Sequence, residues 1–184
     1  MTHKIAKSPQ QFLEQSDLIH TTEVIHAAIN KLAIQITAQL GNSGPLVLSA
    51  MGGAVVFSGQ LLPKLNFPLE FDYVHASRYH NVTHGQNLVW KVLPGNNVQG
   101  RTVLVLDDIL DEGHTLAAIK EKCLALGAEK VVIAVLVEKE LGHPKPVSAD
   151  FVGLNVPNRY VFGYGMDIYG WWRNLPAIYA LKED

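Results

Sequence analysis

The sequence predicts an α/β fold with a central, mostly parallel, twisted sheet flanked by helices. Two apolar runs, at 103–106 and 131–137, suit strands that are buried on both faces of such a sheet. Two strand–glycine–helix passages, at 46–62 and 103–126, indicate that strands and helices follow each other along the chain. Because open α/β sheets bind ligands at the carboxyl ends of their strands, these two turns are the expected places for a site.

The first half of the chain supplies the expected elements in order. Apolar residues at helical spacing predict a helix over 22–40, with Thr22 as its cap and Gly41 just behind its end. A short strand at 46–48 and a helix that ends near residue 62 follow. These elements would form the first strand–helix unit of the sheet.

Two further strands are expected at 71–76 and 87–93. The polar loop between them, 77–86, has a length that is typical of a mobile lid or binding loop. Near the end of the chain, shorter strands are expected at 151–154 and 160–162.

Composition limits the classes of function. The chain has 184 residues and a formal net charge of −2, without a Lys/Arg cluster, which argues against a broad nucleic-acid surface. No apolar run approaches the roughly 20 residues of a membrane span. Cys123 is the only cysteine and falls on the apolar side of the predicted helix after Thr115, so we expect a buried thiol and a cytoplasmic protein.

An acidic, glycine-containing turn follows the strand at 103–106. Asp107 and Asp108 are neighbouring carboxylates, which suit sugar hydroxyls, Mg²⁺ or both. Taken alone, such a pair is as typical of a helix cap or surface loop as of a site. Beyond it, Gly113, the free N–H groups of a helix start and the Thr115 hydroxyl favour a bound phosphate.

The whole run at 103–115 resembles the phosphoribosyl pyrophosphate (PRPP) signature of the type I phosphoribosyltransferases. It has four apolar residues, two acids, two apolar residues and then Asp-x-Gly-x-Thr. The resemblance implies that fold, with a small hood and a flexible lid hairpin. It implies that the ribose and the 5′-phosphate are bound by Asp107, Asp108, Asp111, Glu112, Gly113, His114 and Thr115. Glu112 stands where the family usually has a small residue, so its carboxylate must point away from the phosphate.

A second resemblance covers 150–167, which is similar to the purine-binding hood of the hypoxanthine-guanine phosphoribosyltransferases. It implies that Tyr160 stacks on the purine and that the backbone of Val161 meets the edge of the base. It also implies that Lys139 donates to the purine 6-oxo group. A lysine donor favours hypoxanthine and guanine over adenine, whose 6-amino group presents hydrogens.

The same resemblance implies which residues bind pyrophosphate and Mg²⁺ and which form the lid. The turn after 46–48 aligns with the family's pyrophosphate loop, where Met51 replaces a frequent lysine, so contacts would come from backbone N–H groups. Whether the Ala50–Met51 peptide bond is cis stays open. The implied residues are Met51, Gly52 and Arg173 for pyrophosphate, Asp107, Asp108 and Asp167 for Mg²⁺, and Ser77, Arg78 and Tyr79 for the lid.

The predicted function is purine salvage: transfer of the 5-phosphoribosyl group from PRPP to N9 of hypoxanthine, guanine or both. Asp111 is implied to lie near purine N7 and to accept a proton. The expected partners are PRPP and a 6-oxopurine, with no nucleic acid and no membrane, in a homodimer or homotetramer. We expect one domain over 1–184, with a core at about 22–140 and a hood from the N-terminal segment and about 141–184.

Two other functions share part of this sequence pattern. A phosphoribosyltransferase-like regulator would bind nucleotide or RNA without turnover, but RNA binding needs a basic surface that the charge balance does not offer. A receiver-like signalling protein would need an acceptor Asp at an earlier strand end, and none stands at 46–50. The order of preference among hypoxanthine, guanine and xanthine stays open.

Overall fold

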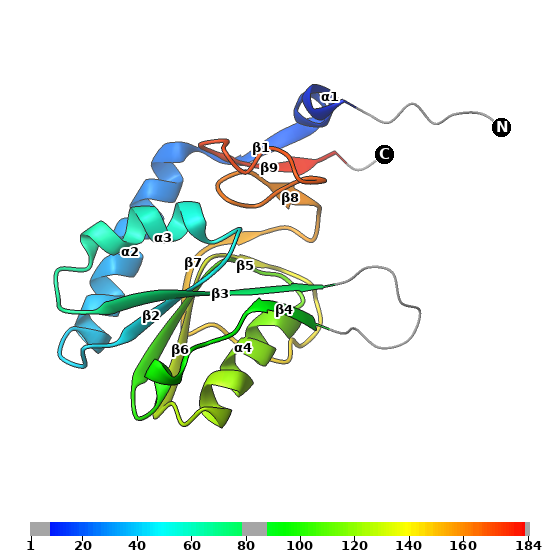
Figure 1. Cartoon of the computed structure of the whole chain (residues 1–184). Helices are drawn as coiled ribbons and strands as arrows, with labels where there is room; N and C mark the ends of the chain where they lie inside the picture. Colours follow the sequence, from blue (N-terminus) through cyan, green and yellow to red (C-terminus); the bar gives the residue numbers. More distant parts are fainter. Residues whose placement is uncertain (1–7, 79–87, 183–184) are drawn as a thin grey trace.

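The computed structural model describes residues 8–78 and 88–182 and contains a large and a small sheet (Figure 1). The elements in chain order are α1 (Pro9–Glu14), β1 (Ser16–His20), α2 (Thr22–Leu40), β2 (Leu46–Ala50), α3 (Val55–Leu61), η1 (Leu62–Lys64), β3 (Glu70–Arg78), β4 (Leu88–Val92), η2 (Asn96–Val98), β5 (Thr102–Leu110), α4 (His114–Ala125), β6 (Lys130–Lys139), β7 (Phe151–Val156), β8 (Val161–Phe162) and β9 (Ile178–Leu181). None of the helices within these residues has the length and apolar character that a membrane crossing requires.

The large sheet has the strand order β4-β3-β2-β5-β6-β7. Its pairings are parallel, except that β4 runs antiparallel to β3, so the predicted mostly parallel sheet is confirmed. Helices α2 and α3 cover one face and α4 covers the other (Figure 1). Alternate residues of β5 serve the two faces: Leu104 packs in the cluster with α2 and α3, and Val105 in the cluster with α4.

The helical predictions are confirmed, with one change at a cap. Helix α2 covers the predicted range, but Thr21 caps it, because its side chain accepts a hydrogen bond from the backbone N–H of Val24 at 3.4 Å. The Thr22 hydroxyl instead donates to the carbonyl of Pro176 at 2.9 Å. On α4, Cys123 is fully buried as expected, and burial raises the pKa of its thiol to about 11.

Strand β5 is longer than predicted. It continues to Leu110, which lies opposite Glu138 of β6, whereas its pairing with β2 ends at Leu106. Asp107 and Asp108 therefore lie within the strand rather than after it, and the expectation that they leave its end is wrong. Because β2 stops earlier, the last four residues of β5 have a neighbouring strand on the β6 side only.

The small sheet joins the two ends of the described chain. Its strands lie in the antiparallel order β1-β9-β8, above the carboxyl ends of the large sheet (Figure 1). The Trp172 indole donates to the Pro9 carbonyl at 2.5 Å, which attaches α1 to the segment between β8 and β9. β7 follows residue 140 but pairs with β6, so this strand belongs to the core rather than to the predicted hood segment.

Candidate active site

An open cleft of about 510 Å³ lies between the carboxyl ends of β2, β5 and β6 and the small sheet. The predicted site residues that line it are Met51, Gly52, Asp107, Asp108, Asp111, Glu112, Gly113, Thr115, Lys139, Tyr160, Val161, Asp167 and Arg173. His114 is exposed at the start of α4 and is not among the lining residues in the described part of the chain. Of the predicted lid, Ser77 and Arg78 end β3, and Tyr79 lies outside the described residues.

Two glycines allow close packing around Asp108, one against its carboxylate and the other against the backbone of the first. A Cβ atom on Gly53 would stand 2.0 Å from Asp108 Oδ2, which no packing tolerates. Gly165 has φ +105°, and a Cβ there would stand 2.1 Å from the carbonyl oxygen of Gly53. The close approach of these two backbones thus holds the hood, through Gly165, against the acidic pair.

The turn after β2 carries a cis peptide bond, between Met51 and Gly52. This is one step after the Ala50–Met51 bond that the sequence left open. The Met51 N–H donates to the carbonyl of Val74 at 2.8 Å. The Met51 N–H is therefore already used within the protein, and Met51, Gly52 and Gly53 all line the cleft.

The two strand acids are close, poorly solvated and like-charged. Burial raises the pKa of Asp107 well above its usual range, and repulsion by Asp108 adds to this effect. Burial also raises the pKa of Asp108, while the nearby Arg173 opposes the rise. The backbone N–H of Asp108 donates to Asp107 Oδ1 at 2.9 Å, which fixes the first carboxylate. A bound cation would relieve the cost of ionising both acids.

Asp107→Asn is expected to flatten the dependence of stability on pH. Because the folded-state pKa of Asp107 is raised, the native chain binds more protons than the unfolded chain between about pH 4 and that raised value. The free energy of unfolding therefore falls as pH rises through this window. The asparagine variant loses the Asp107 share of this fall, while Asp108 keeps its own, so the variant should be more stable than the wild type at neutral pH. Thermal unfolding at pH values from 4 to 8 measures how stability depends on pH in the wild type and the variant. Glu121→Gln, at an exposed position, is the control and should show the same pH dependence as the wild type.

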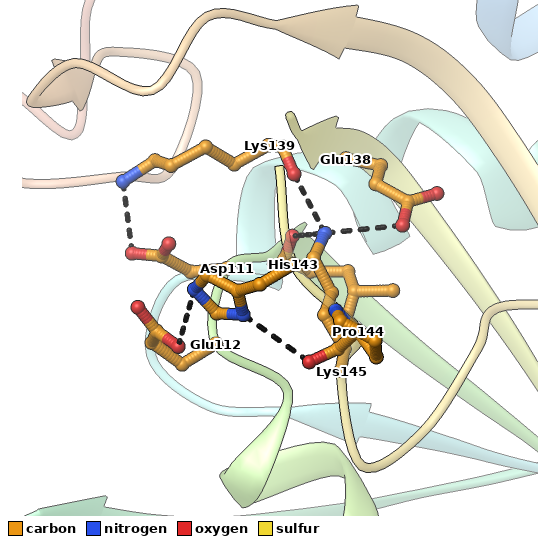
Figure 2. Close-up of polar contacts among 8 residues, drawn as sticks. Asp111, Glu112, Glu138, Lys139, His143, Pro144 and Lys145 are labelled. Atoms are coloured by element: carbon orange, nitrogen blue, oxygen red, sulfur yellow. Dashed lines mark hydrogen bonds and ion pairs between the residues drawn. The ribbon is translucent and has the colours of Figure 1, made fainter. Parts of the chain in front are cut away.

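Asp111 and Lys139 meet at the ends of two neighbouring strands. The Lys139 ammonium donates to Asp111 Oδ2 at 2.9 Å, and the lysine side chain is only 11% exposed (Figure 2). The predicted proton acceptor and the predicted donor to the base thus form one ion pair. The sequence indicated each residue separately and gave no sign that they touch.

The start of α4 has the form of an anion-binding turn. Gly113 adopts the left-handed conformation, with φ +81°, and immediately precedes the helix. The Glu112 carboxylate lies 3.8 Å from His143 Nε2 of the β6–β7 loop (Figure 2). His143 therefore gives the unexpected acid a partner on the neighbouring loop.

The hood contributes aromatic rings and an ion pair. Tyr160 is 45% exposed and stacks on Tyr169, with ring centroids 6.0 Å apart. The ring centroid of Tyr169 lies in turn 5.3 Å from that of Phe12. Arg173 forms a salt bridge with Asp167 and donates to the carbonyl of Gly165 at 2.6 Å. In the cleft lining, the Tyr160 ring, backed by Tyr169, thus adjoins the charged pair Asp167 and Arg173.

Comparison with known proteins identifies the family. The phosphoribosyl transferase domain model matches residues 15–168. The hypoxanthine-guanine phosphoribosyltransferase of Bacillus subtilis (strain 168) is 34% identical over 162 residues, which are 87% of this chain and 89% of the relative. The chain belongs to the hypoxanthine-guanine phosphoribosyltransferase family. The family and the type I fold that the two motifs predicted are confirmed.

Two further relatives extend this result. A solved structure of a hypoxanthine-guanine-xanthine phosphoribosyltransferase is 31% identical, with a TM-score of 0.76, and covers 92% of this chain and 97% of its own. The bifunctional protein TilS/HprT of Listeria innocua is 32% identical over 100% of this chain, which spans only 28% of that longer relative.

Some residues at or beside the cleft were not predicted from the sequence. His75 lines the cleft from β3, Tyr169 backs Tyr160, and Gly165 approaches Gly53. Of these, Gly165 carried a usable signal, since it lies in the hood motif and glycine tolerates close backbone approach. The roles of the other two depend on contacts between distant segments.

Proposed function

We propose that the protein transfers the 5-phosphoribosyl group of PRPP to N9 of hypoxanthine or guanine, giving IMP or GMP and pyrophosphate in purine salvage. The observation that carries this proposal is the single cleft shared by the acidic pair, the phosphate-type turn and the Lys139–Tyr160 wall. The first two features suit a sugar phosphate, and the third suits a flat base with a carbonyl acceptor.

The donor half of the cleft combines β5 and the start of α4 with the turn after β2 and the segment between β8 and β9. In our proposal, Asp107 and Asp108 bind the ribose hydroxyls, and the N–H groups at Gly113 to Thr115 bind the 5′-phosphate. Arg173 and Gly52 bind the pyrophosphate. Arg173 is well placed for this because its other contacts, to Asp167 and to the Gly165 carbonyl, orient the guanidinium at the rim of the cleft.

Magnesium fits this donor set. Two adjacent carboxylates with raised pKa values offer the oxygen ligands that a divalent cation prefers, and the cation would offset their repulsion. In our proposal Asp107 and Asp108 hold Mg²⁺ with the ribose, and Asp167 helps to hold Mg²⁺ on the pyrophosphate. When bound, the metal neutralises charge on the leaving group. Mg²⁺ in kinase-like sites typically takes one or two carboxylates together with phosphate oxygens, as this set allows.

The acceptor half binds and activates the base. Tyr160 stacks on the purine, the Val161 backbone meets its edge, and Lys139 donates to the 6-oxo oxygen. Asp111 then accepts the proton from N7 as the bond from N9 to the anomeric carbon forms and the bond to pyrophosphate breaks. The Lys139 contact keeps the carboxylate of Asp111 oriented for this step.

The finer assignments belong to the same proposal. We infer that the protein acts as a homodimer or homotetramer in the cytoplasm, with PRPP and a 6-oxopurine as its partners. The lone buried thiol of Cys123 suits a reducing compartment. Exposed apolar side chains on β3, including Phe71 and Tyr73, give one candidate surface for subunit contact.

The proposal predicts a defined pattern of pyrophosphate release. With PRPP and Mg²⁺, hypoxanthine or guanine should give turnover, and adenine should give at least 10²-fold lower kcat/KM, because its amino group meets the Lys139 donor. Xanthine is included to rank the 6-oxopurines. PRPP with no base is the blank. PRPP binding without release for any base would instead favour the regulatory alternative.

A further inference from the structure

Lys145 is a buried cation that neither substrate assignment uses. It lies in the loop between β6 and β7, and only 9% of its side chain is exposed. Its ammonium donates to the carbonyls of Leu110 and Lys139, at 3.1 and 2.7 Å, and to Glu138 Oε1 at 3.0 Å (Figure 2). An ammonium has three N–H donors, so these three acceptors use all of them.

The three acceptors belong to the ends of two strands. Leu110 is the last residue of β5 and lies opposite Glu138 in the register with β6. Lys139 is the last residue of β6. Asp111 directly follows Leu110, so the ammonium of Lys145 holds the backbone beside both members of the Asp111–Lys139 ion pair.

The same loop also supports the phosphate turn. His143 lies 3.8 Å from the Glu112 carboxylate (Figure 2). Pro146 Cδ and Val147 Cγ1 lie 3.4 and 3.3 Å from the position that a Cβ atom on Gly113 would take. A displacement of this loop would therefore reach the start of α4 as well as the ends of β5 and β6.

We propose that Lys145 is a positioning residue for phosphoribosyl transfer, which fixes Asp111 relative to Lys139 and steadies the phosphate turn without touching either substrate. The proposal rests on the proposed function, since only that function gives Asp111 and Lys139 their roles. Removing the ammonium leaves two carbonyls and one carboxylate without their donor. Displacement of a reacting group by about 1 Å costs about 10²-fold in rate.

Lys145→Met removes the charge and nearly preserves the volume of the side chain. We expect kcat to fall about 10²-fold, and the affinity for PRPP with Mg²⁺, measured by calorimetry without base, to fall several-fold. Lys145→Arg keeps a cation in place and should recover part of kcat. Lys130→Met, exposed at the opposite end of β6, is the matched control and should retain the wild-type values. Wild-type kcat and PRPP affinity in Lys145→Met would overturn the proposal.

A double-mutant cycle separates positioning from a general loss of stability. If Lys145 acts through Asp111, then Lys145→Met should cost less than about 10-fold when it is added to Asp111→Asn. If the double variant instead loses kcat by the full product of the two single losses, Lys145 does not act through Asp111. Should Lys145→Met fail to fold, Lys145→Gln enters the same cycle. A wild type that binds PRPP without turnover overturns the proposed function and with it the role of Lys145 beside Asp111. The support that Lys145 gives to the phosphate turn is then still tested by the PRPP affinity of Lys145→Met.

Discussion

Asp111→Asn is expected to lower kcat by about 10²–10⁴-fold, with a much smaller change in KM. The amide has nearly the shape of the carboxylate and its oxygen can still accept the Lys139 hydrogen bond, which is 2.9 Å long in the wild type. It cannot accept the N7 proton. The loss should therefore fall on the chemical step rather than on substrate binding.

Steady-state rates at saturating PRPP, Mg²⁺ and hypoxanthine measure this effect. Glu121→Gln makes the same carboxylate-to-amide change at an exposed position on α4 and should keep wild-type turnover. Undiminished turnover of Asp111→Asn would rule out the base role and leave Asp111 as a partner of Lys139 only.

Gly165→Ala is expected to lower the free energy of unfolding by about 2–5 kcal/mol, from backbone strain together with a steric clash. The φ angle of +105° is one that L side chains rarely adopt, and the new Cβ would stand 2.1 Å from the Gly53 carbonyl oxygen. Since backbone rather than a flexible side chain must move, Gly53 and the Asp108 carboxylate packed on it should be displaced too. Activity should fall with stability.

Gly170→Ala is the matched control for this prediction. Gly170 also has a positive φ, +87°, but a Cβ atom there would have nothing within 4 Å. Its cost is the backbone strain alone, about 1–2 kcal/mol. Denaturant unfolding of both variants isolates the clash as the difference between them. Equal losses would mean that the hood adjusts freely around Gly165.

The sheet was predictable because its strands are buried on both faces. An uninterrupted apolar run such as 131–137 has few alternatives to a parallel core strand, and it lies within β6. The two missed strands, β1 and β9, are short and only half buried, and they are paired with each other across the length of the chain. Local pattern contains no information on such a partner.

The candidate site, like the sheet, was predictable only in part. Asp107 and Asp108 stand in a motif with fixed spacing, so their place in the cleft was predictable, although their place within β5 was not. That difference arises because the end of β5 is set by its pairing with β6 rather than by its own residues. Lys145 and Tyr169 act through tertiary contacts with strand ends and rings. A loop lysine and an exposed tyrosine have no sequence pattern that indicates those contacts.

The pairing of β1 with β9 also determines when the acceptor site can form during synthesis. The six strands of the large sheet are available once the chain has been made as far as Val156, so the part that binds the ribose and the 5′-phosphate could assemble before Arg173 is made. β1 is made first but lacks its neighbour until Ile178–Leu181 leave the ribosome. A nascent chain should therefore bind a sugar phosphate before it can enclose a base.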